Sequence, residues 1–243
     1  MPDLGGAHSG YLITHAGFTL LLDCGGGVFA QLRALADPVG VDAVVISHIH
    51  ADHVLDLLTY SFALAHHLGG GQSQRTALWA PPGGRSALAT FASVLGMEEQ
   101  IEEGFAVSEY DPSRPLDLGP VTVRFREVPH YIRAWGCDVR ADDGRRLTYG
   151  ADCGPNDAIV DLGQGTDLLM LEATEGAGPH VGAGQRGHLT AAEAGELARR
   201  AGAARLLLTH YSDALDAAEL GAAAEATFGR NVEMATHGSR YVI

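Results

Sequence analysis

The chain has 243 residues, of which 46% are hydrophobic and 19% are charged, enough apolar material for one large α/β domain. Its formal net charge is −14 and the basic residues other than histidine are all arginine, which argues against general binding to nucleic acid or anionic membranes. No apolar stretch is long enough to cross a bilayer, no signal-peptide pattern is present, and the three cysteines form no CxxC pair. We therefore expect a single cytoplasmic domain over residues 1–243, with its cysteines reduced.

Apolar periodicity and turn residues predict alternating strands and helices. In the first half we expect strands at 10–15, 18–22, 44–47 and 77–80, and helices at 28–35, 54–67 and 85–95. A β-rich block follows, with strands at 105–110, 121–128, 135–140 and 147–151. Helices at 156–162, 190–201 and 214–228 then alternate with strands at 167–171, 205–209 and 241–243. This order predicts the α/β class and a four-layer αββα sandwich, with helices outside two sheets.

The most informative stretch is 47–53, which reads Ser-His-Ile-His-Ala-Asp-His directly after a mostly apolar run. Alternate residues of an extended chain point the same way, so His48 and His50 can reach one metal ion. Asp52 and His53 lie past the strand end and can turn toward a second ion. Histidine and carboxylate ligands without thiolate favour zinc, with manganese or iron as substitutes. The alternative is a surface loop that happens to be rich in histidine, and it explains the combination of strand, spacing and ligand chemistry less well.

Three later strands also end in a residue that can bind metal. His130 follows the predicted strand 121–128, Asp152 follows 147–151, and His210 follows 205–209. A strand-end histidine by itself is more often structural, but three such residues after the histidine cluster favour ligation. The alternating pattern of the first strand predicts one wet face, whereas the third is expected to be buried on both faces.

The seven candidate ligands divide between two ions. Two ions a few Å apart suit hydrolysis, because they lower the pKa of a shared water toward about 7 without Ser or Cys chemistry. The expected first ion is bound by His48, His50 and His130, the second by Asp52, His53 and His210, and Asp152 bridges both.

Several other residues have two interpretations. Asp23 is expected either to orient a metal ligand or to cap a glycine-rich turn. His66 and His67 fall near the end of a predicted helix and are expected to be structural. Cys153 follows a candidate ligand and its role is open, while His8 lies either near the site or at the surface.

The loop 176–187 has five glycines among twelve residues and is expected to form a mobile wall over the metals. Arg186 within it could bind substrate phosphate or lie exposed to solvent. His180 in the same loop is not expected to be a direct metal ligand.

The pattern His-x-His-x-Asp-His at 48–53 resembles the signature of the metallo-β-lactamase superfamily, and the seven candidate ligands match its dinuclear-zinc motifs in order. Three further motifs resemble those of the ribonuclease Z branch: Thr-His-Tyr-Ser at 209–212, Leu-Glu-Ala-Thr at 171–174 and His-Leu-Thr at 188–190. This resemblance implies that Glu172 orients His188, which contacts the scissile phosphate or protonates the leaving oxygen.

The catalytic candidates are therefore Asp52, Glu172 and His188, and the latter two also have structural interpretations. Glu172 could be a buried strand-end acid, and His188 could merely precede the helix N-cap at Thr190.

The chain also departs from ribonuclease Z. Only 21 residues separate His130 from Asp152, and no other segment is long enough for the arm with which that branch grips tRNA. Leu171 and Leu189 replace the His and Ser of two motifs. The chain is more similar to short, actinobacterial-type metallo-hydrolases of the same branch, including atypical cyclic-nucleotide phosphodiesterases.

These resemblances imply a dinuclear-zinc hydrolase in which metal-activated water attacks a small phosphodiester, such as a cyclic nucleotide or short oligonucleotide. The alternatives are a lactone or thioester hydrolase, because fold and metals do not fix the bond cleaved, and a ribonuclease Z-type endonuclease. A metal-binding protein without catalysis, such as a sensor, is a third. We expect a small-molecule substrate, no membrane partner and no extended nucleic acid, and a homodimer is compatible with the resemblance.

Overall fold

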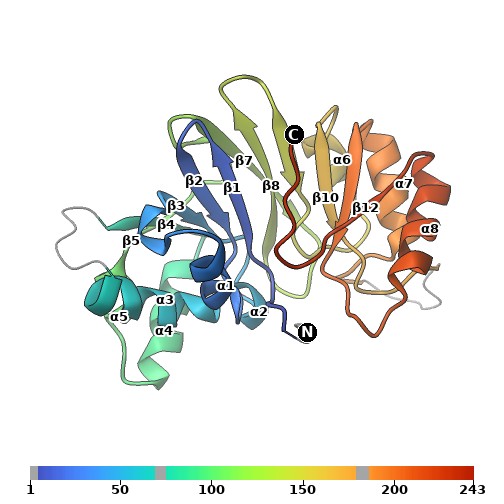
Figure 1. Cartoon of the computed structure of the whole chain (residues 1–243). Coiled ribbons are helices and arrows are strands. Elements are labelled where there is room, and N and C mark those ends of the chain that lie inside the picture. Colours follow the sequence, from blue (N-terminus) through green and yellow to red (C-terminus); the bar gives the residue numbers. More distant parts are fainter. Residues whose placement is uncertain (1–4, 69–74, 179–185) are drawn as a thin grey trace. The chain divides into compact units, whose positions relative to one another are not determined.

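The computed structural model describes residues 5–68, 75–178 and 186–243. The chain divides into two compact units, Met1–Asp111 and Pro112–Ile243, each built on its own sheet (Figure 1). The two sheets with their helices confirm the predicted α/β class. The single domain over 1–243 stays a prediction.

The first unit contains a five-stranded sheet in the order β1-β2-β3-β4-β5. The first two strands form an antiparallel hairpin and the later neighbours are parallel. The strands are β1 (Tyr11–His15), β2 (Phe18–Leu22), β3 (Ala43–Val45), β4 (Thr76–Ala80) and β5 (Phe105–Glu109). The helical segments are α1 (Val28–Leu35), η1 (Pro38–Gly40), α2 (Ala51–Val54), α3 (Asp56–Ala63), the π-helical η2 (Leu64–Leu68), α4 (Gly84–Val94) and α5 (Gln100–Gly104).

The core of this unit forms where apolar helix residues pack on the sheet. Leu32 of α1, Tyr60 of α3 and Leu88 of α4 belong to one buried cluster with Val44 of β3 and Leu78 of β4. Removing such side chains from water is the main stabilising contribution to this layer. The packing fixes β3, whose C-terminal end leads into the histidine cluster.

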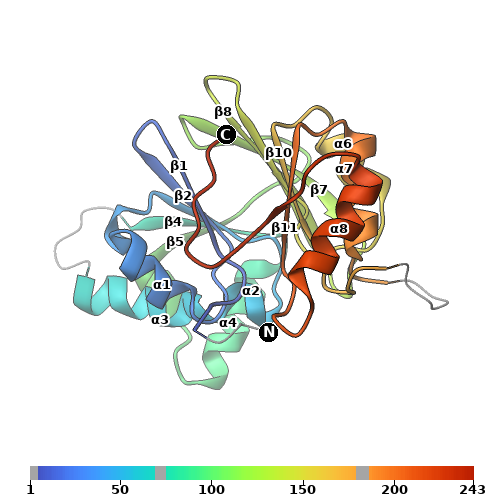
Figure 2. The same ribbon diagram turned by 45° about the vertical axis from the view of Figure 1, so that its right-hand side comes forward.

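The second unit contains a seven-stranded sheet in the order β12-β11-β10-β9-β8-β7-β6. Its antiparallel part comprises β6 (Leu116–Asp117), β7 (Val121–Val128), β8 (Ala134–Ala141) and β9 (Arg146–Tyr149). Its parallel part runs from β9 through β10 (Leu168–Glu172) and β11 (Arg205–Thr209) to β12 (Glu233–Met234). Helices α6 (Asp157–Leu162), α7 (Ala191–Ala201) and α8 (Ala217–Phe228) lie together on one face of this sheet (Figures 1 and 2).

Burial follows the position of each strand in this sheet. All residues of β10 are buried, and β11 is buried from Leu206 to Thr209, as expected for parallel strands covered on both faces. In β7, by contrast, Val121, Val123 and Phe125 are buried while Arg124 is exposed. The two predictions of strand burial are therefore confirmed.

Two predicted elements differ from the structure. The strand expected at 241–243 is wrong, since the last strand is β12 at Glu233–Met234, where it pairs with β11. The helix expected at 54–67 is divided into α2, α3 and η2, with a break at Leu55. The short elements α5 and β6 were not predicted. Of the helices that the structure describes, none has the length and apolar character needed to cross a membrane.

Candidate metal centre

The histidine cluster of the first unit lies immediately after β3. His48 and His53 are fully buried, whereas His50 and Asp52 are partly exposed. The Nε2 atom of His48 lies 3.2 Å from Nδ1 of His50, and the His48 and His53 ring centroids are 4.0 Å apart. Zn–N bonds of 2.0–2.1 Å in a tetrahedron place two ligand nitrogens roughly 3.3 Å apart, so the His48–His50 spacing suits two ligands of one ion.

The Asp23 carboxylate orients this cluster through hydrogen bonds. Its Oδ1 accepts a hydrogen bond from the Ser47 backbone N–H, and its Oδ2 accepts from Ser47 Oγ and from His53 Nδ1, all at 2.8 Å. Because the Ser47 hydroxyl donates its proton to Asp23, it accepts from Nδ1 of His48 at 3.0 Å. One carboxylate thus places protons on the Nδ1 atoms of His48 and His53, which leaves their Nε2 lone pairs available for metal.

Backbone hydrogen bonds attach α2, which carries Asp52 and His53, to neighbouring segments. The carbonyl of Asp52 accepts from Ser9 N at 3.2 Å, and the N–H of Asp56 donates to Cys24 O at 3.1 Å. These two bonds use the donor and acceptor that would otherwise pair within a continuous helix, which explains the break at Leu55. Gly25 packs against the same carbonyl, where an added Cβ would lie 1.9 Å from Asp52 O.

In the second unit, His130, Asp152 and His210 follow β7, β9 and β11. The side chains of His130 and Asp152 are almost fully buried, and that of His210 is 16% exposed. Oδ2 of Asp152 lies 3.9 Å from Nε2 of His130 and 3.5 Å from Nε2 of His210. The C-terminal ends of β9 and β11 meet at one edge of the parallel part, which brings Asp152 and His210 together.

The two histidines of this unit also have their Nδ1 atoms engaged. Nδ1 of His130 donates to the carbonyl of Gly187 at 2.7 Å. Thr174 Oγ1 donates to the His210 carbonyl and lies 2.9 Å from Nδ1 of His210, so it accepts the proton of that nitrogen. Both Nε2 atoms therefore face Asp152 as potential ligands. Neither Thr174 nor Ser47 was predicted to take part, because their roles depend on pairings distant in sequence.

Glu172 and His188 form a hydrogen-bonded pair in the same unit. Nδ1 of His188 lies 2.9 and 3.0 Å from the two Glu172 carboxylate oxygens, and Glu172 also accepts from the Cys153 N–H at 2.8 Å. The His188 ring stacks on His210 with centroids 6.0 Å apart and meets the His130 ring edge-on at 5.0 Å. The orientation expected for His188 is present, and its catalytic role stays a prediction.

The pair has perturbed acidity. Burial raises the pKa of Glu172, and the hydrogen bond from His188 acts against this shift. Burial by itself would lower the pKa of His188, but the hydrogen bond and charge of Glu172 outweigh it and raise that pKa. His188 is therefore disposed to carry a proton that Nε2 can deliver, since Nδ1 is engaged with Glu172.

The donor set fits a divalent metal ion. In the first unit, His48 and His50 place potential ligand atoms within 4.8 Å of each other, and so do Asp52 and His53. In the second unit, the same holds for Asp152 with His210, and for the group Glu172, His188 and His210. Imidazole nitrogen and carboxylate oxygen without thiolate are the ligands preferred by zinc in hydrolytic sites.

Three residues in or next to the candidate site have a left-handed backbone. Among the described residues, left-handed φ angles outside glycine occur at Ala16, Asp23 (59°), Ala151 (53°) and His210 (48°). The last three lie at the ends of β2, β9 and β11, where the chain turns sharply to direct a side chain of the site. Such a conformation is uncommon for residues with a Cβ, although Asp and His adopt it more readily than alanine does.

The remaining candidates are structural in their contacts. His8 is partly buried and hydrogen-bonds Gly26 O at 3.2 Å. His66 lies 3.4 Å from Glu103 and contacts the Phe62 ring, and His67 contacts the same ring.

Cys153 is buried, and burial raises the pKa of its thiol, as does the charge of Glu172. Arg186 pairs with Glu193, the capping-box residue of α7. His180 and residues 179–185 of the predicted loop lie outside the described residues.

Comparison with known proteins places this chain in a family. The family model of the beta-lactamase superfamily domain matches residues 19–211. The uncharacterized protein Rv1339 of Mycobacterium tuberculosis is 36% identical over 205 residues, covering 83% of this chain and 73% of the relative. The probable metallo-hydrolase YhfI of Bacillus subtilis is 30% identical over 219 residues, covering 86% and 82%. Ribonuclease BN of Escherichia coli O157:H7 is 27% identical over 244 residues, covering 81% and 79%.

The fold agrees with these matches. The crystal structure of YhfI superposes with a TM-score of 0.87 at 26% identity, covering 98% of this chain and 93% of that chain. The chain therefore belongs to the beta-lactamase superfamily. It is a metal-dependent hydrolase, and its predicted resemblance to the ribonuclease Z-like branch of metallo-β-lactamase-fold proteins is confirmed.

Proposed function

We propose that the protein is a cytoplasmic hydrolase that uses two zinc ions to cleave a small phosphodiester, such as a cyclic nucleotide or a short oligonucleotide. The observation that carries the proposal is the Glu172–His188 pair beside His130 and His210. A proton donor next to metal ligands is what a phosphodiester needs, because its alkoxide leaving group departs as a strong base. The similarity to ribonuclease BN, whose name denotes cleavage of RNA, supports the same chemistry.

In this proposal the seven ligands serve two ions, and manganese or iron could replace zinc. When bound, the ions lower the pKa of a water molecule toward about 7 and neutralise negative charge on the phosphate. The support is the donor chemistry of the two histidine sets and the order of the ligand motifs in the sequence. We assign His48, His50 and His130 to one ion, Asp52, His53 and His210 to the other, and Asp152 to both.

The residues of the chain then have distinct tasks. Glu172 keeps the proton of His188 on Nδ1 and favours the charged imidazole. His188 gives its Nε2 proton to the departing oxygen, while Nδ1 keeps its proton against Glu172. Asp23 and Thr174 do not touch substrate but keep three histidines in the tautomer that metal requires.

A small substrate is favoured over a large RNA. The segment between His130 and Asp152 is occupied by β8, a turn and β9, which leaves no chain for an RNA-gripping arm there. A net charge of −14 also disfavours extended contact with phosphates. The proposed partner is thus a small-molecule phosphodiester rather than an extended nucleic acid.

The proposal is tested with zinc-loaded protein of measured metal content. Hydrolysis of bis-(p-nitrophenyl) phosphate, cyclic AMP and a dinucleotide is compared with a panel of lactones and thioesters and with a tRNA precursor. The His188→Ala variant should keep its zinc and lose about 10²- to 10⁴-fold in kcat. The matched control is His66→Ala, which removes an exposed imidazole that pairs with Glu103 and should leave both quantities unchanged. Turnover of lactones alone would refute the phosphodiester assignment.

A further inference from the structure

Tyr131 is a large aromatic residue that the fold leaves open to solvent at the site. It is 64% exposed, although it directly follows His130, whose side chain is fully buried. The next residue, Ile132, is 39% exposed. Burying an aromatic ring is strongly favourable. Two neighbouring exposed apolar side chains beside a candidate metal ligand therefore point to a surface that contacts a bound molecule.

The ring of Tyr131 is placed against the proposed catalytic groups. Its centroid lies 5.1 Å from that of His130 and 5.5 Å from that of His188, in a T-shaped arrangement with the latter. Gly187 allows this approach, because a Cβ there would lie 2.9 Å from Cε2 of Tyr131 and 3.0 Å from Nδ1 of His130. The tyrosine is therefore close to the imidazole that we assign to the leaving oxygen.

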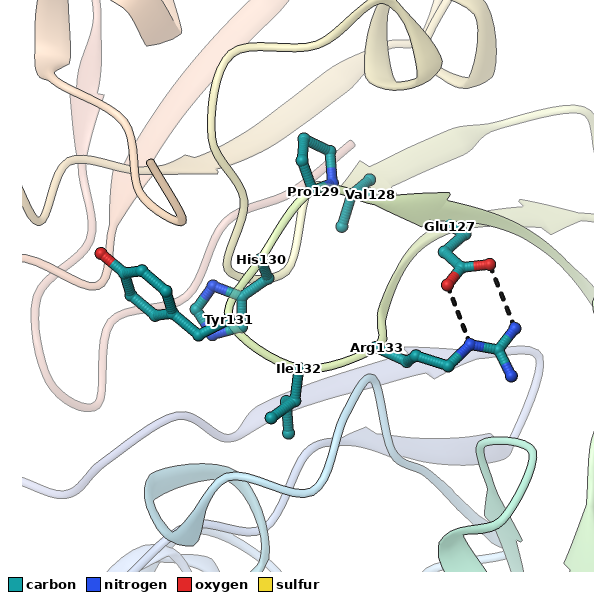
Figure 3. A pocket seen from close by; sticks show the side chains of 7 residues that line it. All are labelled: Glu127, Val128, Pro129, His130, Tyr131, Ile132 and Arg133. Atoms are coloured by element: carbon teal, nitrogen blue, oxygen red, sulfur yellow. Dashed lines mark hydrogen bonds and ion pairs between the residues drawn. The ribbon is translucent and has the colours of Figure 1, made fainter. Parts of the chain in front are cut away.

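The segment that carries Tyr131 is well anchored. The two ends of the bend are joined by Arg133, which donates two hydrogen bonds to the Glu127 carboxylate at 2.9 and 3.1 Å (Figure 3). The Arg133 guanidinium also lies 4.8 Å from the Trp135 ring centroid. The bend lines a pocket of about 560 Å³, and the Tyr131 side chain extends away from the Glu127–Arg133 pair (Figure 3). An anchored, exposed ring loses little conformational freedom when it binds a ligand.

We propose that Tyr131 is a stacking surface for a nucleobase, so that the substrate of this site is a nucleotide diester rather than a simple alkyl phosphodiester. This inference rests on the proposed function and narrows its substrate class. Stacking on an aromatic side chain accepts any base, because every base has a π-face. It needs no added positive charge, which suits an acidic chain in which Arg133, two residues after Tyr131, is engaged with Glu127.

The test compares a ligand that carries a base with a ligand of the same sugar phosphate that lacks it. Adenosine 5′-monophosphate and ribose 5-phosphate are titrated calorimetrically into zinc-loaded protein, and kcat/KM is measured for their methyl esters. The wild type should prefer the adenosine ligand by about 5- to 150-fold, the range that base–aromatic stacking provides. Tyr131→Ala should reduce this preference to about twofold or less, whereas Tyr131→Phe keeps the ring and should retain it.

Two further variants separate stacking from structural effects. Tyr131→Leu keeps apolar bulk without the π-face and should also reduce the preference to about twofold or less. It provides the same test if the alanine variant folds poorly. Phe91→Ala removes a ring that is 38% exposed on α4 and should leave the binding and turnover of both ligands unchanged.

An unchanged preference in Tyr131→Ala and Tyr131→Leu, or no preference in the wild type, would overturn the inference. Absence of hydrolysis of every phosphodiester by the wild type would instead refute the proposed function, whatever the binding preference.

Discussion

Replacing Asp23 by asparagine should weaken metal binding without removing a ligand. The carboxylate accepts three hydrogen bonds, and the asparagine amide has one oxygen in place of two. If that oxygen keeps the Ser47 N–H, the amide nitrogen faces the Ser47 hydroxyl and Nδ1 of His53, both of which are donors. His53 is then driven to the tautomer with its proton on Nε2, the nitrogen that metal needs.

The size of the effect follows from the two contacts that are lost. Changes in groups that orient metal ligands reduce affinity by about 10- to 100-fold, or roughly 1.4–2.7 kcal/mol. Each hydrogen bond to a charged group contributes about 1.5–3 kcal/mol, and removal of a buried charge offsets part of this loss. We therefore expect zinc-free Asp23→Asn to lose about 3 kcal/mol of unfolding free energy.

A matched control separates the two effects. Asp138 is also buried, and it accepts hydrogen bonds from Arg146 at 3.0 Å and from Thr148 at 2.8 Å, without contact to any proposed ligand. Asp138→Asn should lose similar stability in guanidinium unfolding but bind zinc normally in competition with a chromophoric chelator. If folded Asp23→Asn binds zinc within twofold of the wild type, the tautomer argument is refuted.

Three other outcomes are expected. Gly25→Ala should shift α2 and lower zinc binding about tenfold, because the new Cβ collides with Asp52 O, whereas Gly40→Ala meets no atom within 4 Å and should bind normally. Thr174→Val removes the acceptor of the His210 Nδ1 proton and should lower zinc affinity by roughly tenfold while the melting temperature changes little; normal affinity would contradict its role. The three cysteines are buried and should react with a thiol reagent at pH 8 only at the rate of unfolding; rapid native labelling would show that the packing is wrong.

Much of the fold was predictable because its signals are local. The bounds predicted for β2, α1, β7 and β11 are those observed, since alternation, apolar runs and glycine turns mark them directly. The same local rule, a strand that ends in His or Asp, selected His130, Asp152 and His210, which do follow β7, β9 and β11; their binding of metal stays a prediction.

Features that depend on distant pairings were not predictable. Residues 241–243 are suited to a strand by composition, yet β12 forms at Glu233–Met234, where Leu207 and Leu208 of β11 provide its partners. The break at Leu55 results from bonds to Ser9 and Cys24, which the helical pattern of the segment does not reveal.

Side-chain environments also had to come from the structure. Asp23 had two equal interpretations, and the structure shows that its carboxylate contacts Ser47 and His53, which favours the orientation of a candidate ligand. Tyr131 has no marker in the sequence besides its place after His130.

The left-handed backbone at Ala151 has a consequence for engineering. The alanine side chain takes no part in chemistry, and a glycine would adopt its φ of 53° without steric penalty. Ala151→Gly is therefore expected to raise the melting temperature. It would also increase backbone flexibility one residue before Asp152. Thermostability and precise alignment of the proposed bridging carboxylate compete at this position, so a variant selected only for survival at high temperature would tend to sacrifice turnover.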